Sequence, residues 1–190
     1  GVIPPQFLDT PIDYENLAKI GSIMGSGGLI VMDETDCIVD VAKFYLQFTV
    51  DESCGKCAPC RIGGRTLFNY LDKITQGRGA LEDLEQLKTV GEAMRKASLC
   101  GLGQTAPNPV LSTLRYFEEE YREHILDRRC RAGKCKDLIR YFITEQCVGC
   151  TVCARVCPVK CISGKVKERH AIDQEKCIKC GQCMAACKFS

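Results

Sequence analysis

The chain has 190 residues, of which 16 are cysteine, and a formal net charge of +2. Hydrophobic residues make up 45% and charged residues 26% of it, which is typical of globular proteins and excludes disordered and collagen-like architectures. No apolar run approaches the roughly 18 residues that span a bilayer, so we expect no membrane span. The N-terminus lacks an initiator Met and a signal-peptide layout, and we expect a fragment of a longer polypeptide.

The cysteines recur as Cys-x-x-Cys, a spacing that indicates metal or cluster ligation rather than disulfide bonds. Thiols two residues apart converge on one ion or cluster far more readily than they form separate bridges. A chain with enough apolar residues for a core also has no need of a disulfide framework. We therefore predict reduced thiols and a cytoplasmic protein.

In the first segment, glycines between Gly21 and Gly28 precede the apolar run 29–32. Their order differs from that of the dinucleotide-binding fingerprint, and the run that follows predicts a strand rather than a helix. This stretch is therefore predicted to be a turn followed by a strand.

The middle of the chain holds a close cysteine triplet with a distant fourth member. The set is Cys54, Cys57, Cys60 and Cys100. Helical periodicity covers 61–74 and 81–97, and glycines in the linker 75–80 favour a helix end there. Two antiparallel helices would return the chain to its start, so these four cysteines are predicted to hold one 4Fe–4S cluster.

Two further helices are predicted around this pair. One covers 39–48 and leads straight toward the triplet. The other begins at Asn108 and Pro109, a cap residue followed by proline, and runs toward His124. The result is a small helical bundle with a cluster at one end.

Four cysteines lie outside the cluster motifs: Cys37, Cys130, Cys135 and Cys161. Cys130 and Cys135 flank a glycine-containing turn shortly after His124, and they supply three corners of a tetrahedral site together with that histidine. We predict a structural zinc at Cys37, His124, Cys130 and Cys135. The alternatives are reduced buried thiols with an exposed histidine, or a 4Fe–4S cluster held by three cysteines and His. Cys161 is predicted to pack as a small apolar residue.

The last third contains an internal repeat in which every cysteine recurs 30 residues later. The two runs are Cys147, Cys150, Cys153, Cys157 and Cys177, Cys180, Cys183, Cys187. This spacing is the signature of bacterial two-cluster ferredoxins, in which the fourth cysteine of each run binds the other cluster. The predicted ligand sets are therefore Cys147, Cys150, Cys153, Cys187 and Cys177, Cys180, Cys183, Cys157. Zinc ribbons would require cysteine pairs rather than triplets.

A hairpin is predicted between the two runs, over 162–173, because polar and apolar residues alternate there around a basic turn. His170 lies in this hairpin and is expected to be exposed. Lys188 follows Cys187 where the signature has proline, and the sequence ends at Ser190, so we expect the terminal strand to be missing or very short.

The segments 52–61 and 98–103 resemble the 4Fe–4S bundle of NADH-oxidising flavoprotein subunits, and 21–33 resembles the end of the β-grasp domain that precedes that bundle. With the appended ferredoxin module, the chain is similar to the flavoprotein (beta) subunit of electron-bifurcating NAD-dependent iron–iron hydrogenases. The resemblance implies that FMN and NAD bind only in a missing N-terminal part, and that this fragment transfers electrons without hydride chemistry. It also implies a hetero-oligomer with an iron–iron hydrogenase catalytic subunit, a small 2Fe–2S thioredoxin-like subunit and ferredoxin as partners.

The fold class that follows is α+β, in four parts. They are the C-terminal part of a β-grasp domain (1–38), a helical 4Fe–4S bundle (39–126), a linker with a candidate zinc hinge (127–137) and a two-cluster ferredoxin-like domain (138–190). Alternatives from the same class are the equivalent segments of an NAD-dependent formate dehydrogenase or an NADP-linked hydrogenase.

Bound clusters alter the charge of the chain. Three oxidised clusters with four thiolates each, and one zinc, would bring the net charge to about −5. A general nucleic-acid binder needs a net basic face, so no nucleic-acid partner is expected. The remote rival is a nucleic-acid enzyme whose clusters are structural.

Overall fold

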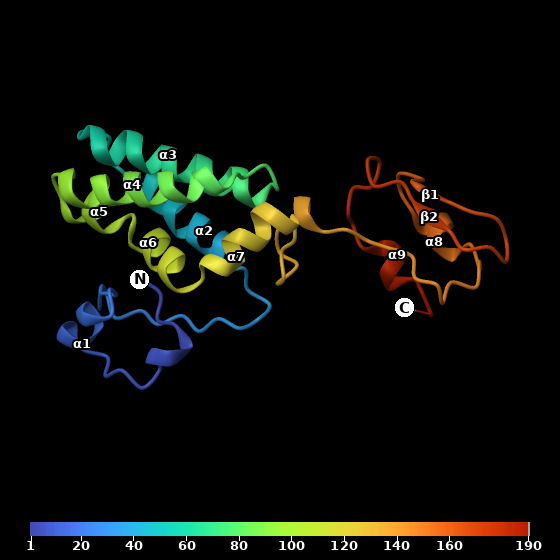
Figure 1. Ribbon diagram of the computed structural model, residues 1–190, viewed down its shortest axis with the longest axis horizontal. Coiled ribbons are helices and arrows are strands. Elements are labelled where there is room, and N and C mark those ends of the chain that lie inside the picture. The colour runs from blue at the N-terminus through green and yellow to red at the C-terminus, as the bar shows by residue number, and fades with distance from the viewer. Residues whose placement is uncertain (190) are drawn as a thin grey trace. The chain divides into compact units, whose positions relative to one another are not determined.

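Helices make up most of the larger of two units into which the chain divides, Gly1–Leu138 and Ile139–Ser190. The computed structural model describes residues 1–189. Three long helices lie side by side in the larger unit (Figure 1): α2 (Ile38–Asp51), α3 (Ala58–Thr75) and α4 (Leu81–Ala97). The shorter helical elements of this unit are η1 (Pro5–Phe7), α1 (Tyr14–Lys19), α5 (Gly101–Thr105), α6 (Asn108–Tyr116), α7 (Glu118–Arg122), the π-helical turn η2 (Glu123–Asp127) and η3 (Lys136–Leu138).

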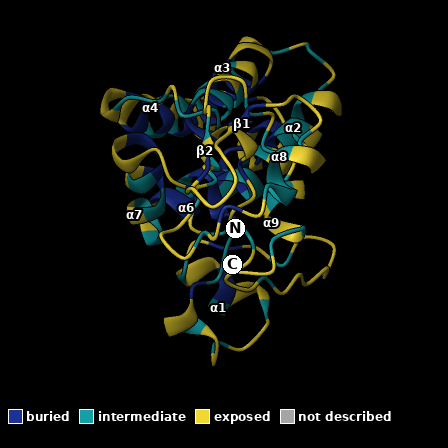
Figure 2. Cartoon of the chain, turned by 90° about the vertical axis from the view of Figure 1, so that its right-hand side faces the viewer, coloured by how far each residue is buried: buried dark blue, intermediate teal, exposed yellow. Residues whose placement is uncertain are grey.

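The core of this unit forms where the apolar stripes of the long helices meet. Fully buried residues on them include Val39, Ala42, Leu46, Leu67, Leu71, Ile74, Leu87 and Met94. Figure 2 shows buried residues on the inner faces of these helices and exposed residues outside. The three predicted helices are thus confirmed. The third of them, α4, has the predicted bounds, whereas α3 starts earlier because Pro59 fits its first turn.

The helix predicted from Asn108 toward His124 is interrupted. At Phe117 the backbone leaves the helical region, with φ −134° and ψ 31°, and α7 begins immediately afterwards. The break brings the fully buried Tyr121 hydroxyl within 2.7 Å of the Thr113 hydroxyl, so that each satisfies the other. His124 then falls in the π-helical turn η2, a type of turn that is frequent at functional sites.

The strand predicted over 29–32 is wrong for this structure. Those residues pair with no strand in the part of the chain that is described, and Leu29, Ile30 and Val31 are exposed. A strand needs a neighbouring strand for its backbone hydrogen bonds, and no segment within the described residues offers one here.

The smaller unit contains two short helices and one hairpin. In chain order these are α8 (Val152–Val156), β1 (Ile162–Ser163), β2 (Ala171–Ile172) and α9 (Gln182–Ala185). The strands are antiparallel, with Ile162 opposite Ile172, which confirms the predicted hairpin. His170, expected to be exposed, is only 2% exposed because it lies on the same inward face as Ile172.

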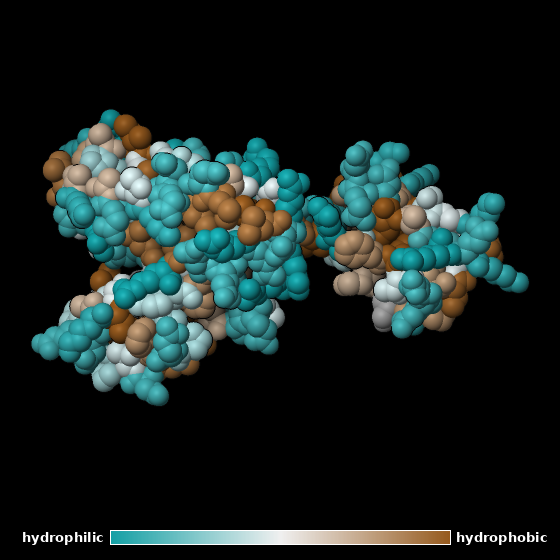
Figure 3. Space-filling view, viewed as in Figure 1, coloured by the Kyte–Doolittle hydropathy of each residue, from teal (hydrophilic) through white to brown (hydrophobic). Residues whose placement is uncertain are grey.

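None of the helices within residues 1–189 is both long and apolar enough to cross a membrane. Hydrophilic side chains cover much of the visible face of each unit (Figure 3).

The packing of the bundle predicts a specific loss of stability. Leu71→Ala should lower the free energy of unfolding by about 2–5 kcal/mol, because Leu71 is fully buried and its removal leaves a cavity. Leu8→Ala is the matched control, since Leu8 is 74% exposed and should change stability by less than about 0.5 kcal/mol. Denaturant unfolding followed by circular dichroism measures both. Equal effects of the two substitutions would contradict this description of the core.

Candidate metal centres

The predicted cysteines of the helical bundle line one cavity of about 100 Å³ in the larger unit. Its thiols are Cys54, Cys57, Cys60 and Cys100, and its other walls come from Glu52, Ser53, Lys56 and Leu102. The volume is several times that needed by one water molecule, so the cavity accommodates a group larger than a single ion. The structure therefore brings together all four cysteines that the sequence placed in one ligand set.

Helix N-termini supply positive partial charge to this cavity. Cys57 is the N-cap of α3 and Cys100 the N-cap of α5. Backbone N–H groups of Leu99 and Cys60 lower the pKa of the Cys57 thiol. The first N–H groups of a helix have no partner within the helix, and they favour a thiolate for that reason.

Gly103 explains why the turn after Cys100 is rich in glycine. A Cβ at this position would lie 2.7 Å from the Ser98 side chain and 3.0 Å from the Cβ of Cys60. Only glycine therefore allows α5 to approach the first turn of α3 so closely. Gly101, in contrast, has open space where a Cβ would stand.

In the smaller unit, a second cavity gathers cysteines from both runs of the repeat. It is lined by Cys157, Cys161, Cys177, Cys180 and Cys183, together with Tyr141 and apolar residues. Cys157 comes from the first run and the triplet from the second. This is the crossed arrangement that the spacing predicted. The arrangement follows from the packing of α8 against α9, since Cys157 is the C-cap of α8 and Cys187 lies two residues after the end of α9.

The triplet of the first run ends in α8, which contains Cys153. Burial raises the pKa of the Cys153 thiol, and the charges of Cys147 and Cys150 raise it further, as expected for sulfurs that lie close together. The backbone N–H of His170 lowers the pKa of the Cys147 thiol. The hairpin thus donates a hydrogen bond to this predicted ligand, a contact that the sequence did not indicate.

Gly149 permits that contact. Its φ is +68°, and a Cβ there would lie 2.5 Å from the backbone nitrogen of Glu168. The carbonyl of Gly149 accepts a hydrogen bond of 3.1 Å from the N–H of Lys167. The cysteine loop therefore lies directly against the hairpin, and any side chain at position 149 would separate them.

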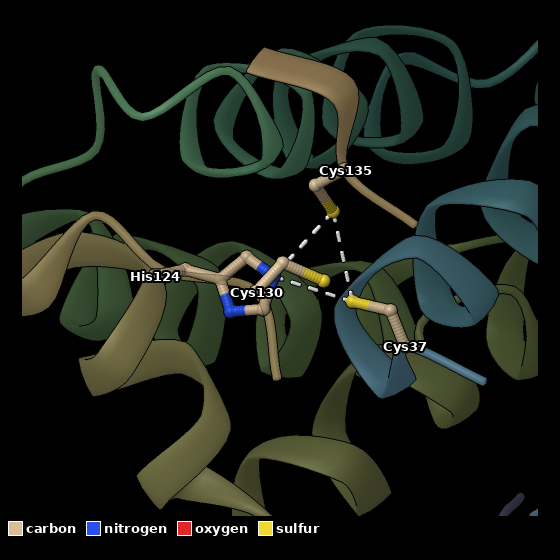
Figure 4. Close-up of side chains that lie close together, drawn as sticks. All are labelled: Cys37, His124, Cys130 and Cys135. Atoms are coloured by element: carbon tan, nitrogen blue, oxygen red, sulfur yellow. Dashed lines mark hydrogen bonds between the residues drawn. The ribbon is translucent and has the colours of Figure 1, made fainter. Parts of the chain in front are cut away.

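A third group of thiols includes a histidine and lies entirely within the larger unit. Its members are Cys37, His124, Cys130 and Cys135, all buried, and their ligand atoms lie within 4.8 Å of one another. Figure 4 shows these side chains pointing toward a common centre. The Cys37 sulfur lies 3.2 Å from Nε2 of His124 and 3.7 Å from the Cys135 sulfur, and Cys135 lies 3.4 Å from the same Nε2.

These separations fit the edges of a tetrahedral zinc site. With Zn–S about 2.3 Å and Zn–N about 2.0 Å, tetrahedral geometry gives S···S near 3.8 Å and S···N near 3.5 Å. A disulfide would require sulfurs about 2.05 Å apart, and none of the cysteines within residues 1–189 forms one. The donor set of three thiols and one imidazole therefore fits a structural zinc, and the zinc itself stays a prediction.

Glu120 orients the histidine of this group. The Nδ1–H of His124 donates a hydrogen bond of 2.7 Å to the backbone carbonyl of Glu120, which leaves Nε2 to face the thiols. The carboxylate of Glu120 accepts from the N–H of Ile38 in the first turn of α2, and burial raises its pKa. Glu120 was absent from the predicted site, because nothing in a run of three glutamates distinguishes one of them.

Two thiols of this group, Cys37 and Cys135, also form a hydrogen bond with each other. A hydrogen bond from Cys135 lowers the pKa of Cys37 to about 4, and the same bond raises the pKa of Cys135. Burial lowers the pKa of His124, but hydrogen bonding to Cys37 and the charge of its thiolate outweigh burial and raise it. A divalent cation would take the place of the protons that these groups share, because zinc binds thiolates and neutral imidazole.

Salt bridges hold the loop that carries Cys130 and Cys135. Glu123 accepts a hydrogen bond of 2.7 Å from Arg131 and lies 3.6 Å from Arg129, and Lys134 lies 3.9 Å from Asp36 beside Cys37. Arg129, Arg131 and Lys134 are thus paired with acidic residues of the larger unit. The exposed pairs add little stability individually, but together they fix the loop's position.

The chain is similar to iron–sulfur proteins over nearly its whole length. Residues 40–124 match the NADH-ubiquinone oxidoreductase-F iron–sulfur binding region, and residues 139–190 match a 4Fe–4S dicluster domain. Over 190 residues, all of this chain, it is 54% identical to the NADP-reducing hydrogenase subunit HndC of Solidesulfovibrio fructosivorans, and it spans 39% of that protein. Over 125 residues, 66% of this chain, it is 42% identical to a subunit of the NADH-quinone oxidoreductase of Streptomyces coelicolor, and it spans 28% of that subunit's length.

A solved structure has the same fold over a length close to that of the larger unit. The crystal structure of an NAD+-reducing nickel–iron hydrogenase in the air-oxidised state matches 64% of this chain and 20% of that one, with a TM-score of 0.57 and 32% identity. The cysteine-lined cavities lie within the two matched iron–sulfur regions. The chain therefore carries the iron–sulfur binding region of NADH-ubiquinone oxidoreductase F-type subunits, joined to a 4Fe–4S dicluster domain that serves electron transport.

Proposed function

We propose that this chain is the iron–sulfur electron-transfer segment of the flavoprotein subunit of an NAD-dependent, electron-bifurcating iron–iron hydrogenase. The observation that carries the proposal is a pair of cavities, each lined by a predicted set of four cysteines, in a chain that aligns throughout with a hydrogenase subunit. Bound 4Fe–4S clusters supply one-electron transfer. The complete complex would carry electrons between reduced flavin, a hydrogenase catalytic subunit and ferredoxin.

The proposed ligands form three sets. They are Cys54, Cys57, Cys60, Cys100; Cys147, Cys150, Cys153, Cys187; and Cys177, Cys180, Cys183, Cys157. The protein's own contribution is to place these thiols on helix N-termini and tight turns, where backbone N–H groups stabilise thiolates. Partial burial of Cys153 and Cys183 raises the pKa of each thiol and limits the access of water to both ferredoxin sites.

The proposed domain division retains the four parts 1–38, 39–126, 127–137 and 138–190. Exposure of three consecutive apolar residues at 29–31 supports the proposal that 1–38 ends a β-grasp domain, because such residues are normally covered by a neighbouring strand or helix. FMN and NAD would bind in a preceding part of the subunit. We also propose a cytoplasmic location, because cysteines that bind clusters must stay reduced.

The proposed partners are an iron–iron hydrogenase catalytic subunit, a small 2Fe–2S thioredoxin-like subunit and ferredoxin, in a hetero-oligomer. An NADP-linked hydrogenase is the second candidate, and similarity to the 54% identical NADP-reducing hydrogenase subunit favours it. The segment from an NAD-dependent formate dehydrogenase is the third.

We further propose that Cys37, His124, Cys130 and Cys135 hold a structural zinc. Burial of all four residues, their tetrahedral spacing and the hydrogen bond that fixes the His124 ring support this proposal. The ion would join the start of α2 to the loop 130–135, which follows the bundle. Its role would therefore be to fix the end of the larger unit, next to the ferredoxin module in the sequence.

Isolation of the native complex tests the proposed function. Anaerobic purification through this subunit should yield an iron–iron hydrogenase catalytic subunit and hydrogen-dependent reduction of NAD. Reduction of NADP alone would favour the second candidate. Recovery of a molybdenum-containing formate dehydrogenase subunit would contradict the hydrogenase proposal.

The approach of α5 to α3 predicts a selective loss of the bundle cluster. Gly103→Val should reduce the iron content by about four atoms per chain, because its side chain would push Cys100 away from Cys60. Gly101→Val is the matched control and should keep the full iron content, since its site is open. Iron analysis with electron paramagnetic resonance (EPR) of the reduced protein separates the two. Retention of all clusters in Gly103→Val would contradict the proposed ligand set.

The zinc proposal predicts about one zinc per chain in protein purified without nickel affinity. Cys37→Ala should reduce this to near zero, because it leaves three ligands on a buried ion. Cys161→Ala is the control, since Cys161 lies outside the group and should leave zinc unchanged. Mass spectrometric metal analysis provides the measurement. Iron in place of zinc at these residues, or zinc retained in Cys37→Ala, would exclude the proposed site.

A further inference from the structure

The cavity of the smaller unit has one cysteine more than a cluster needs. Its five thiols belong to the four proposed ligands Cys157, Cys177, Cys180 and Cys183, and to Cys161. A 4Fe–4S cluster takes four protein ligands. Cys161 was predicted to pack as an apolar residue, and at 5% exposure it is buried as expected, but its neighbours are thiols.

Cys161 contacts two of the proposed ligands. Its sulfur lies 3.5 Å from the Cys157 sulfur, and its backbone N–H donates to that same sulfur at 3.4 Å. The Cys177 thiol is a second hydrogen-bond partner of the Cys161 thiol, whose single proton bonds to one sulfur at a time. An S–H group is a weak donor, but a hydrogen bond becomes stronger when its acceptor is ionised, as a cluster-bound thiolate is.

We propose that Cys161 is a positioning residue that donates an S–H hydrogen bond to the Cys157 sulfur and thereby raises the reduction potential of the cluster at Cys157, Cys177, Cys180 and Cys183. The proposal rests on the ligand set proposed above. Reduction adds one electron to the cluster and increases the negative charge on its sulfurs. A donor at a ligand sulfur therefore stabilises the reduced form more than the oxidised form.

Two substitutions separate the hydrogen bond from packing. Cys161→Val removes the donor and keeps an apolar group of similar size, whereas Cys161→Ser keeps a donor in a smaller group. The full-length subunit in its native complex would be titrated anaerobically by EPR at fixed potentials, with iron counted in every sample. The bundle cluster at Cys54, Cys57, Cys60 and Cys100 lies in the other unit and serves as the internal control.

The expected result is an unchanged iron content of about twelve atoms and a lower potential for one cluster in Cys161→Val. The oxidised-to-reduced ratio of that cluster at a fixed potential should rise about fivefold, which is about 40 mV at 59 mV per tenfold change. Cys161→Ser should restore most of the shift, and the bundle cluster should not shift.

Two results would overturn the proposal. Loss of about four iron atoms in both variants would make Cys161 a ligand rather than a donor. Unchanged potentials in Cys161→Val would leave apolar packing as its entire role. Iron analysis of the unaltered protein comes before any titration. Fewer than about twelve iron atoms there would contradict the proposed ligand sets, whatever the role of Cys161.

Discussion

Thiolates repel one another when they converge, and this protein must offset that repulsion wherever four ligands meet. In the bundle, Cys57 and Cys100 cap helices and Cys57 accepts backbone N–H groups. In the smaller unit, the N–H of His170 reaches the sulfur of Cys147. Partial positive charges from the backbone therefore act where sulfur charge accumulates. Backbone N–H groups at the start of α3 and in the hairpin therefore point at predicted cysteine ligands, and the packing of the helices and the hairpin holds them there.

Glycines allow the ligand-bearing segments to approach one another where a side chain would separate them. Gly103 allows α5 to contact the start of α3, and Gly149 allows a cysteine loop to contact the hairpin. Repulsion between thiolates is reduced differently in the group that contains His124. There, Cys37 and Cys135 share a proton, and a backbone carbonyl orients the histidine. A compact set of ligand atoms suits one ion, whereas the wider cavities suit clusters. Under the proposed assignment, cysteine would serve clusters in the wider cavities and, together with His124, one ion in the compact group.

Much of this could be predicted from the sequence because the signals are local. Apolar periodicity predicted the long helices, and the spacing of Cys147 to Cys157 predicted a crossed arrangement that is seen for Cys157 in the second cavity. Cys37 and His124 lie 87 residues apart, yet the number of unassigned ligands was small enough to link them. The features that the sequence did not predict are contacts that depend on three-dimensional packing. Burial of His170, the break at Phe117 and the contacts of Cys161 and Glu120 have no signature in spacing or composition.

Fifteen of the 16 cysteines are proposed to divide into three cluster sites and one separate zinc site, with Cys161 outside all four. Anomalous X-ray scattering from crystals of the anaerobically purified protein, recorded on either side of the iron and zinc absorption edges, tests it most directly. We expect iron density inside the two cysteine-lined cavities and next to Cys147. Zinc density should be confined to the centre of the group formed by Cys37, His124, Cys130 and Cys135. Iron at that centre, zinc at a predicted cluster site, or disulfides in place of metal would contradict it.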